Sequence, residues 1–368
     1  MYEVYFYYKD NGVTSRYYKS SFLTKKAAND HEVEKKAELI ETGKIRKEIK
    51  KTFGQVYEEF LDVGASQYQE STIHNTKKYY RYLEKELSHI PITMFDYSLL
   101  QKFFNSKKTN GYATNEGMKK TINRVLNYAI KVDYIKTNPL SLVTITGVEN
   151  HIERDEVLLY DDFIALTEEL ERNGSFRYKA YSMAIKIGYY TGLRVSEILA
   201  LEKSDFNFED NIINVNKKLV YCGLRKEEIH VTNQMKSRKS KAVIPLAKPL
   251  KEELIRWFNE NPFERVLCDE NEYYFNPHVI SIAIKKKASL LGINFHFHML
   301  RHTFATTLVT NNVDLKTAQE LMRHTNLDTT ISVYTHINEQ HKLDVVNEIF
   351  TKKSGGKVAN LENKKILN

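Results

Sequence analysis

Residues 191–201, Thr-Gly-Leu-Arg-Val-Ser-Glu-Ile-Leu-Ala-Leu, form the most informative segment of this 368-residue chain. Gly192 follows an apolar stretch and predicts the end of a helix, and Ser196 and Glu197 predict the start of the next one. Arg194 then lies at a helix N-terminus, where backbone amide groups and the helix dipole favour an anion. Taken alone, the segment is explained better as a surface arginine beside an ordinary joint between two helices.

Two further groups of cations and imidazoles follow along the chain. In His298-Met-Leu-Arg301-His302, the first histidine and the arginine are three residues apart, so on a helix both face the same way, as a phosphate clamp requires. His324 and Tyr334 come next, separated by a stretch of Asn, Asp and Thr that predicts a turn into a helix. A core tyrosine with hydrogen-bonded histidines nearby is the alternative, since the chain has 24 Tyr and 12 His.

One β region interrupts the predicted helices of the C-terminal half. Alternating or β-branched residues predict strands at 212–215, 227–233 and 241–246. The charged turn Lys236-Ser-Arg-Lys-Ser240 separates the last two, which predicts a hairpin with Lys236 at its tip. Arg238 and Lys239 are also basic, and we interpret them as DNA-binding residues.

The N-terminal segment predicts a small sheet followed by one helix. Tyrosine-rich residues 2–8 and 14–23 flank a turn signal and predict two or three strands. Thr24 is the predicted cap of a helix that runs to about Ile40 and is stopped by Gly43. Its predicted apolar stripe comprises Ala27, Ala28, Val33, Ala37 and Leu39 or Ile40. A sheet laid in a DNA groove and a small sheet with solvated lysines are equally consistent with the basic residues interleaved among the tyrosines, and the candidate DNA-binding residues are Arg16, Tyr17, Lys19 and Lys25.

Residues 52–142 show helical periodicity in four segments, at 53–60, 72–87, 99–104 and 115–134, and predict an all-helical bundle. Lys119, Lys120 and Arg124 give it a basic surface that we interpret as DNA-binding, although a solvated helix face explains these charges equally well. The polar, acidic stretch 147–156 predicts a linker, and the Lys-, Gly- and Asn-rich end of the chain predicts a poorly ordered tail.

The composition fits a protein that binds a polyanion. Fifty-five Lys and Arg against 47 Asp and Glu give a net charge of +8. The 42% of hydrophobic residues suffices for two or three domains with packed cores. Because there is no leader-like segment and no long apolar run, the sequence predicts a soluble cytoplasmic protein without membrane contact.

Several classes of chemistry are excluded by missing motifs. Cys222 and Cys268 are the only cysteines, too few for a disulfide framework or a zinc site. The chain has no Gly-rich phosphate loop of ATP-driven motors, and Met299 stands where a zinc protease needs a glutamate between its two histidines. The sequence therefore predicts neither a metal nor another cofactor.

Taken in order, these motifs resemble a tyrosine recombinase of the phage-integrase family, in particular integrases of Gram-positive phages and integrative elements. The series comprises Thr191-Gly-Leu-Arg194-x-x-Glu197, Lys236 ahead of Val243-Ile-Pro-Leu246, His298-x-x-Arg301-His302, His324 and Tyr334, and it covers the C-terminal half. Met322-Arg323-His324 departs from the Leu-Gly-His of many members, and because it keeps the imidazole we expect no effect on catalysis.

The resemblance implies a multidomain, mainly α fold with small β sheets (α+β). A three-stranded sheet plus helix at 1–46 would bind arm-type DNA sites, and a helical bundle at 50–146 would bind core sites. A mixed α/β catalytic domain would occupy 155–351, followed by a flexible tail at 352–368.

The resemblance also implies roles for the site residues. Arg194 and Arg301 would bind the phosphate, while His298 helps Tyr334 to attack it and form a 3′-phosphotyrosine. Lys236 would protonate the leaving oxygen, and His324 would add a hydrogen bond to the phosphate. Glu197 and His302 would support these groups from behind.

The implied activity is site-specific integration and excision of a mobile element. Expected partners are double-stranded attachment sites, three further copies of the chain in a homotetramer on DNA, a directionality factor (excisionase) and a host DNA-bending protein. Two alternatives remain open: a DNA-binding regulator that kept the fold without the chemistry, and a type IB topoisomerase. The complete residue set argues against the first, and the arm-type N-terminal segment argues against the second.

Overall fold

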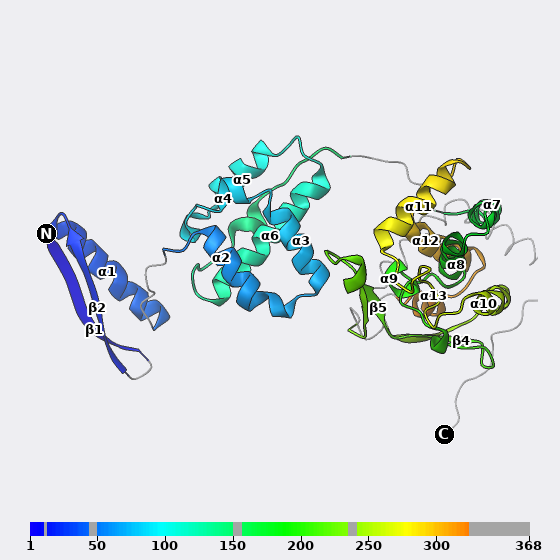
Figure 1. The fold of residues 1–368 in the computed structure, drawn as a ribbon. Coiled ribbons are helices and arrows are strands. Elements are labelled where there is room, and N and C mark those ends of the chain that lie inside the picture. Colours follow the sequence, from blue (N-terminus) through cyan, green and yellow to red (C-terminus); the bar gives the residue numbers. More distant parts are fainter. Residues whose placement is uncertain (11–12, 44–49, 150–156, 235–240, 324–368) are drawn as a thin grey trace, which may run out of the picture. The chain divides into compact units, whose positions relative to one another are not determined.

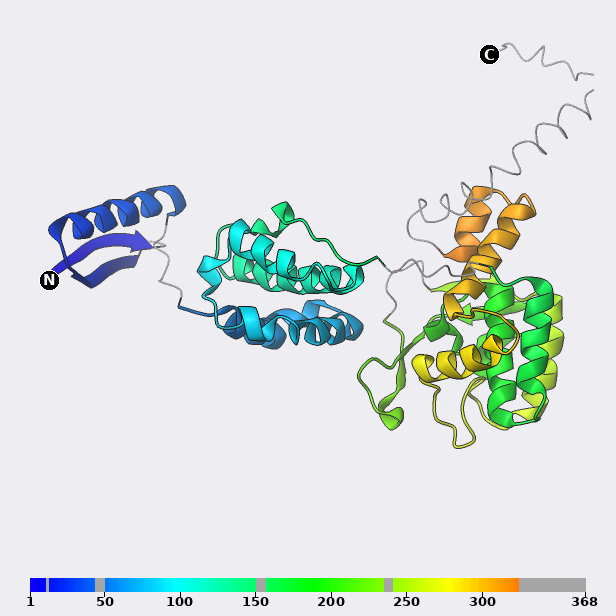
Figure 2. The same ribbon diagram turned by 90° about the horizontal axis from the view of Figure 1, so that it is seen from above.

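The computed structural model describes residues 1–10, 13–43, 50–149, 157–234 and 241–323. The chain divides into two compact units, residues 1–150 and 151–368. Both are mainly helical and carry small antiparallel sheets (Figures 1 and 2). The predicted fold class is confirmed at this level. Among the described residues, no helix is long and apolar enough to cross a bilayer.

The N-terminal segment is a hairpin covered on one face by a helix. Strands β1 (Tyr2–Asp10) and β2 (Val13–Phe22) pair antiparallel, and helix α1 (Lys25–Thr42) packs against both. The Thr24 hydroxyl accepts a hydrogen bond from the Ala27 amide at 3.1 Å, and Gly43 ends the helix with a φ of 74°. Both helix boundaries agree with the sequence prediction.

Two predictions for this segment are not fully confirmed. Within residues 1–10 and 13–43 the sheet has two strands instead of three, because β2 runs unbroken and passes directly into the cap of α1. The predicted apolar stripe of α1 is confirmed only in part, since Ala28 is buried at 4% exposure whereas Val33 and Ile40 are 68% and 87% exposed. The face that packs on the sheet contains Ala28 and His31, because the sheet offers aromatic rings that contact the imidazole: the rings of Phe22 and Tyr17 lie 5.0 Å and 5.9 Å from it, centroid to centroid.

Residues 50–149 contain a helical bundle with its own core. Thr52 and Gln55 form a reciprocal capping box at the start of the first helix. The predicted helix at 72–87 is two helices, because the chain turns before Leu83, which is fully buried. The bundle helices are α2 (Phe53–Glu59), α3 (Glu70–Tyr80), α4 (Glu84–Leu87), α5 (Tyr97–Ser106) and α6 (Tyr112–Lys131).

The second unit is built around one central helix, α8, which packs against α7, α10 and α12 (Figure 1). A hydrogen bond of 2.8 Å from the Leu158 amide to the Thr303 hydroxyl joins the start of this unit to α12. Its helices are α7 (Tyr160–Glu171), α8 (Phe176–Thr191), α9 (Val195–Ile198), α10 (Lys248–Glu260), α11 (Pro277–Ser289), α12 (Phe297–Thr310) and α13 (Leu315–Met322).

Two small sheets lie beside these helices. The first has the order β3-β4-β7 and the second pairs β5 with β6. In the first sheet, Ile213 lies opposite Ile244, and both side chains are buried in the core. The strands are β3 (Phe206–Asn207), β4 (Ile212–Val215), β5 (Lys218–Val220), β6 (His230–Thr232) and β7 (Ala242–Pro245).

The sequence predicts that the strands around 227–233 and 241–246 pair with each other as a hairpin, and this pairing is wrong. The structure has both strands, but β6 pairs with β5 and β7 pairs with β4. The reason is a strand that the sequence prediction missed: β5 supplies β6 with a nearby antiparallel partner, which leaves β7 to complete the other sheet. Lys236 lies between β6 and β7, outside the described residues.

Candidate active site

The turn between α8 and α9 places Arg194 at a helix N-terminus, as predicted. Gly192 ends α8 with a φ of 62°, and Arg194 is the N-cap residue of α9. A side chain at Gly192 would be strained by this backbone angle, and its Cβ would lie 2.6 Å from the Phe304 ring. The Arg194 side chain is 42% exposed, so its guanidinium is accessible to an anion.

Arg301 lies on α12 and is almost completely buried, at 4% exposure. Its guanidinium donates one hydrogen bond to the Gly192 carbonyl, at 2.7 Å, and another to the Met322 carbonyl. Burial, together with repulsion from Arg194 and Arg323, lowers the pKa of Arg301 to about 9. The side chain therefore remains charged at neutral pH while it connects the ends of α8 and α13.

Glu197 links the exposed arginine to a buried one. Its carboxylate accepts hydrogen bonds from the Arg194 backbone amide at 3.0 Å and from the Arg194 guanidinium at 3.1 Å. It accepts a third from the Arg323 guanidinium at 2.7 Å. Burial opposes ionisation of Glu197, but the adjacent Arg323 and Arg194 outweigh it and lower the pKa of the carboxyl group. Glu197 is therefore ionised and held between two cations.

His298 lies one turn before Arg301 on α12, and its ring meets that of His302 edge-on with centroids 4.7 Å apart. The ring is accessible at the surface yet crowded by its neighbours. Desolvation, followed by repulsion from His302 and Arg301, lowers the pKa of His298 to about 4. At neutral pH the imidazole is therefore uncharged in the free protein and able to accept a proton.

The structure thus brings together Arg194, Glu197, His298, Arg301 and His302. Five other predicted residues lie outside the described part of the chain, namely Lys236, Arg238, Lys239, His324 and Tyr334. The described chain ends at Arg323, one residue before His324, on the turn that closes α13.

Two residues of this cluster were missed as site residues by sequence reasoning. Gly192 was assigned only as a helix end, but its carbonyl also holds Arg301. Arg323 was treated as a neutral departure from a motif, but it is a buried partner of Glu197. The available signal was a long charged residue at a position where a helix-ending turn favours glycine.

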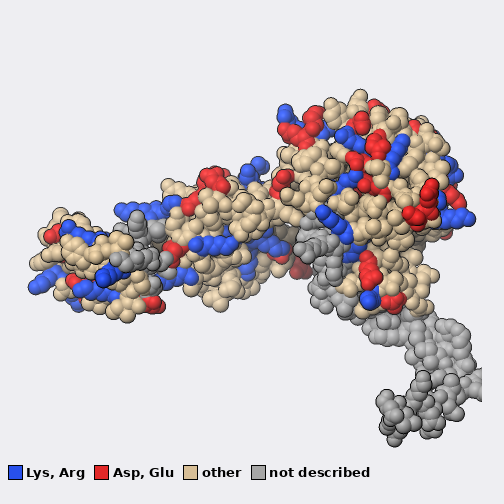
Figure 3. Space-filling model, turned by 90° about the horizontal axis from the view of Figure 1, so that it is seen from below, with Lys and Arg blue, Asp and Glu red and all other residues tan. Residues whose placement is uncertain are grey.

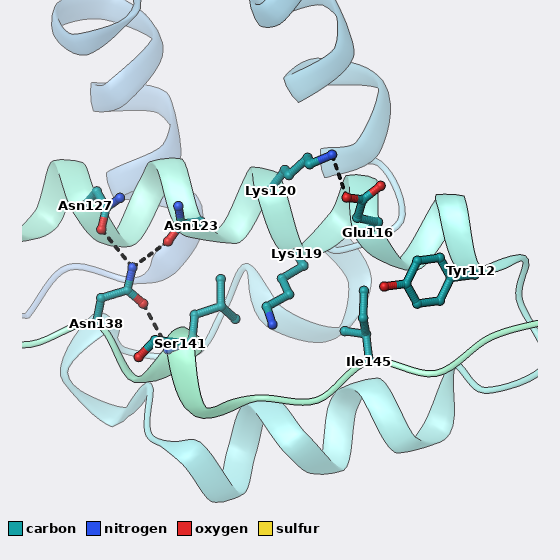
Figure 4. Close-up of a pocket in the computed structure, with 10 residues that line it drawn as sticks. Tyr112, Glu116, Lys119, Lys120, Asn123, Asn127, Asn138, Ser141 and Ile145 are labelled. Atoms are coloured by element: carbon teal, nitrogen blue, oxygen red, sulfur yellow. Dashed lines mark hydrogen bonds and ion pairs between the residues drawn. The ribbon is translucent and has the colours of Figure 1, made fainter. Parts of the chain in front are cut away.

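Two of the three basic residues predicted on the helical bundle, Lys119 and Lys120, line a cavity of about 600 Å³ between α6 and residues 138–145 (Figure 4). Lys119 reaches across it to the Val143 carbonyl, at 2.5 Å, and Lys120 pairs with Glu116 at 2.7 Å. Arg124 lies elsewhere on α6, half-buried, and its guanidinium donates to the Thr76 hydroxyl at 3.2 Å. Lys119 and Lys120 are thus the residues of this set at the cavity.

Asparagines form the other end of this cavity. The Asn138 amide donates hydrogen bonds of 2.7 Å to the side-chain oxygens of both Asn123 and Asn127, which are one turn apart on α6 (Figure 4). These bonds use the amide oxygens, so the two α6 asparagines present their amide hydrogens outward. Together with Lys119 and Lys120, they make this surface rich in hydrogen-bond donors.

The N-terminal sheet has one open face that is rich in aromatic residues. Arg16 lies on this face, with its guanidinium 5.2 Å and 5.3 Å from the ring centroids of Tyr5 and Tyr18. Tyr17 points to the other face, where its hydroxyl lies 2.6 Å from the His31 ring nitrogen. Because neighbouring residues of a strand point to opposite faces, Lys19 lies on the same face as Tyr17, opposite to Arg16 and Tyr18. Lys25 is exposed in the first turn of α1.

Exposed charged side chains can be compared between the two units of the described chain. On the face shown in Figure 3, Lys and Arg side chains lie over the sheet-and-helix segment and the helical bundle with some Asp and Glu among them, and residues 157–323 also show both signs. Both units therefore offer exposed cations on this face, whereas Arg301 and Arg323 of the second unit are buried.

Comparisons with known proteins match this architecture. The model of the Phage integrase family matches residues 156–341, about half of the chain, and that of the Phage integrase SAM-like domain matches residues 52–146. A tyrosine recombinase of Thermosipho africanus is 28% identical over 233 residues, which cover 62% of this chain and 73% of the relative.

Two solved structures share the fold. The Tn1549 transposon integrase in complex with a circular intermediate DNA matches with a TM-score of 0.64 and 21% identity over 80% of this chain and 99% of that one. A lambda integrase tetramer bound to a Holliday junction matches with a TM-score of 0.57 and 17% identity over 88% of this chain and 93% of that one.

Proposed function

The chain belongs to the phage integrase family and is a tyrosine recombinase, an enzyme of site-specific DNA recombination, and we propose that Arg194 and Arg301 bind the phosphate that its nucleophile, Tyr334, attacks. We further propose that the recombined sites are the ends of a mobile genetic element, which the enzyme integrates and excises. The arginine pair, brought to one place from α9 and α12, is the observation that carries this proposal.

The chemistry needs these cations because the nonbridging oxygens of a phosphodiester repel a nucleophile. A guanidinium is suited to this role, since its planar fork makes two hydrogen bonds and it stays charged at neutral pH. Arg194 is exposed and Arg301 is held rigidly by two carbonyls, so one cation is accessible at the surface and the other is preorganised.

Tyr334 would attack the phosphorus, with His298 assisting the loss of its hydroxyl proton. A tyrosine has a free pKa of about 10 and needs a base near neutral pH. The lowered pKa of His298, about 4, leaves the ring uncharged in the free protein, so a ring nitrogen can accept the proton. The negative charge of a bound phosphate would raise this pKa and make the imidazole a better base. His302, whose ring contacts His298, would help to hold it in place.

The oxygen–phosphorus bond that forms would release a 5′-hydroxyl and leave a 3′-phosphotyrosine. Lys236 would donate the proton to the departing oxygen, and His324 would hydrogen-bond the phosphate. A 5′-hydroxyl of another strand would then attack the phosphotyrosine, return the proton and free the tyrosine. The covalent link conserves the bond energy, so the cycle needs neither ATP nor a metal.

Two surfaces would hold the DNA, in line with the domain division proposed from the sequence. The bundle at 50–146 would bind core sites through Lys119, Lys120 and, near them, Arg124. The segment 1–46 would bind arm-type sites through the open sheet face around Arg16, with Lys19 and Lys25 near its edges and Tyr17 supporting the sheet. Arg238 and Lys239 of the catalytic domain, 155–351, would contact the DNA backbone beside the cleavage site.

Recombination joins two duplexes with two strand breaks each, so we propose that four copies act together on DNA. The lambda integrase tetramer bound to a Holliday junction is a precedent among the structures of this fold. A directionality factor and a host DNA-bending protein would select between integration and excision.

The test uses a nicked duplex that carries the DNA at the ends of the element encoding the chain. Wild-type protein should become covalently attached to it on a denaturing gel, and Tyr334→Phe should bind the duplex with similar affinity but form no covalent product. Attachment by the Tyr334→Phe protein would refute the nucleophile assignment. Strand exchange between two such duplexes would distinguish a recombinase from a topoisomerase that only relaxes DNA.

A further inference from the structure

The end of α13 and the residue after it are linked to both proposed phosphate-binding arginines. Met322, the last residue of α13, accepts a hydrogen bond from the Arg301 guanidinium through its carbonyl. The next residue, Arg323, donates from its guanidinium to Glu197, which in turn holds Arg194. Two consecutive residues thus reach both arginines, by a backbone contact to one and through a carboxylate to the other.

Arg323 occupies this turn in an unfavourable backbone conformation. Its φ of 52° lies in the left-handed region, where glycine is accommodated without the strain that a side chain causes. A local signal would therefore favour glycine here. The Arg323 side chain is 2% exposed and bonded to the Glu197 carboxylate. The strained backbone at this position therefore occurs together with a specific buried contact.

The charges explain what this contact does. Glu197 is 3% exposed, and a buried carboxylate needs a positive partner. Among the groups that favour its ionised form, Arg323 contributes most, ahead of Arg194. If Arg323 were absent, Glu197 would have to be neutralised by Arg194 or by a proton.

Resting on the proposed function, we propose that Arg323 is a positioning residue that neutralises Glu197 and so leaves the charge of Arg194 available to the scissile phosphate. Among the described residues, the cluster contains three guanidinium groups and one carboxylate, Glu197, so positive charge is in excess there. Attack on a phosphodiester monoanion by a tyrosine builds up further negative charge on the phosphoryl oxygens, and this excess of positive charge complements it.

Arg323 acts through Glu197 and not by contact with DNA. Its side chain is buried, whereas that of Arg194 is 42% exposed. Glu197 holds Arg194 at two points, the backbone amide and the guanidinium, so it also fixes the direction of the exposed side chain. Arg323 allows Glu197 to orient Arg194 without cancelling its charge.

The experiment is a double-mutant cycle on the full-length chain, with Arg323→Gly, Glu197→Gln and the double variant. Glycine takes the left-handed conformation without strain, so Arg323→Gly removes the guanidinium and spares the turn. The measurements are the single-turnover rate of covalent attachment to the nicked duplex at saturating protein, the Kd for the duplex and the melting temperature.

We expect Arg323→Gly to slow attachment by about 10- to 100-fold, less than the loss of a direct phosphate ligand, with Kd changed by less than about threefold. Adding Glu197→Gln should recover a large part of the rate, because a neutral amide does not compete for Arg194.

Additive losses in the double variant would show that Arg323 only packs the turn and would overturn the proposal. Arg323→Gly with the wild-type rate would overturn it as well. Failure of the wild-type protein to attach to the duplex would instead contradict the proposed function, so the two failures are distinguishable. The melting temperature is the control for folding. If Arg323→Gly and the double variant lose the same amount of stability, the recovery of the attachment rate in the double variant is not caused by a change in stability.

Discussion

Arg301 and Lys120 are both cations assigned to DNA binding, but the fold holds them in opposite ways. Arg301 is 4% exposed and bonded to two backbone carbonyls. Its burial disfavours the charged form and lowers the pKa of the guanidinium to about 9. Lys120 lies on an exposed face of α6 and pairs with Glu116, one turn away. Charge interactions are strong in a desolvated site and are screened at the surface.

This contrast separates catalysis from affinity. A buried, prepositioned guanidinium stabilises charge at one place without reorganisation, so the loss of one such group should affect the chemical step. Exposed lysines act through the total number of phosphates they neutralise, so the loss of one should change affinity and its dependence on salt. The following predictions test that separation, starting with the largest effect.

Arg301→Lys should reduce the single-turnover rate of covalent attachment by about 10²- to 10³-fold or more, because an ammonium cannot bond both carbonyls and still face the phosphate. The Kd for the duplex should change by only a few fold. Arg194→Lys is the matched variant on the exposed side and should show the same pattern. Weakened binding with an unchanged rate at saturation would place these arginines in the same class as the surface lysines.

Gly192→Ala should lower the free energy of unfolding by about 1–3 kcal/mol and slow attachment, because the added Cβ would meet the Phe304 ring where the carbonyl holds Arg301. Gly174→Ala is the control: its φ of 66° is similar, and nothing lies within 4 Å of its added Cβ. It should cost about 1 kcal/mol and leave the rate unchanged. Chemical denaturation and single-turnover kinetics measure both effects, and equal rate losses would argue against a special role for Gly192.

Lys119→Ala and Lys120→Ala should each weaken binding to the duplex by about two- to tenfold and reduce the slope of log Kd against log salt by about 1. The rate at saturating protein should be unchanged, since these side chains are expected to contact only the backbone of DNA. Lys102→Ala, on α5 of the same bundle and outside the α6 cavity, serves as the control. A loss of rate at saturation would break the proposed separation.

The smallest expected effect is on stability in acid. Folding lowers the pKa of His298 from 6.5 to about 4, so between these values the unfolded chain binds a proton that the folded chain does not. Stability should therefore fall as the pH decreases through this window, and His298→Gln should show a shallower fall in denaturation experiments. Arg194→Ala should raise the pKa of His298 measured by NMR. A measured His298 pKa at or above 6.5 would show that burial and the neighbouring cations do not lower the pKa of this imidazole.

Local signals in the sequence were sufficient for the elements that carry the cluster. Gly192, Ser196 and Glu197 predicted the end of α8 and the start of α9, and the three-residue spacing of His298 and Arg301 placed them together on α12. Caps, turns and helical spacing depend on residues within about one turn of each other, so they can be read from the chain directly.

Only the tertiary structure decided which distant elements meet. β6 pairs with β5 and not with β7, α1 packs through Ala28 and His31 while Val33 and Ile40 stay exposed, and Arg323 contacts a carboxylate 126 positions earlier in the chain. These outcomes depend on which partners the rest of the fold brings within reach. For Arg323 the local preference pointed to glycine, and the fold instead buries an arginine whose guanidinium bonds Glu197, a partner too distant in the chain for any local pattern to indicate.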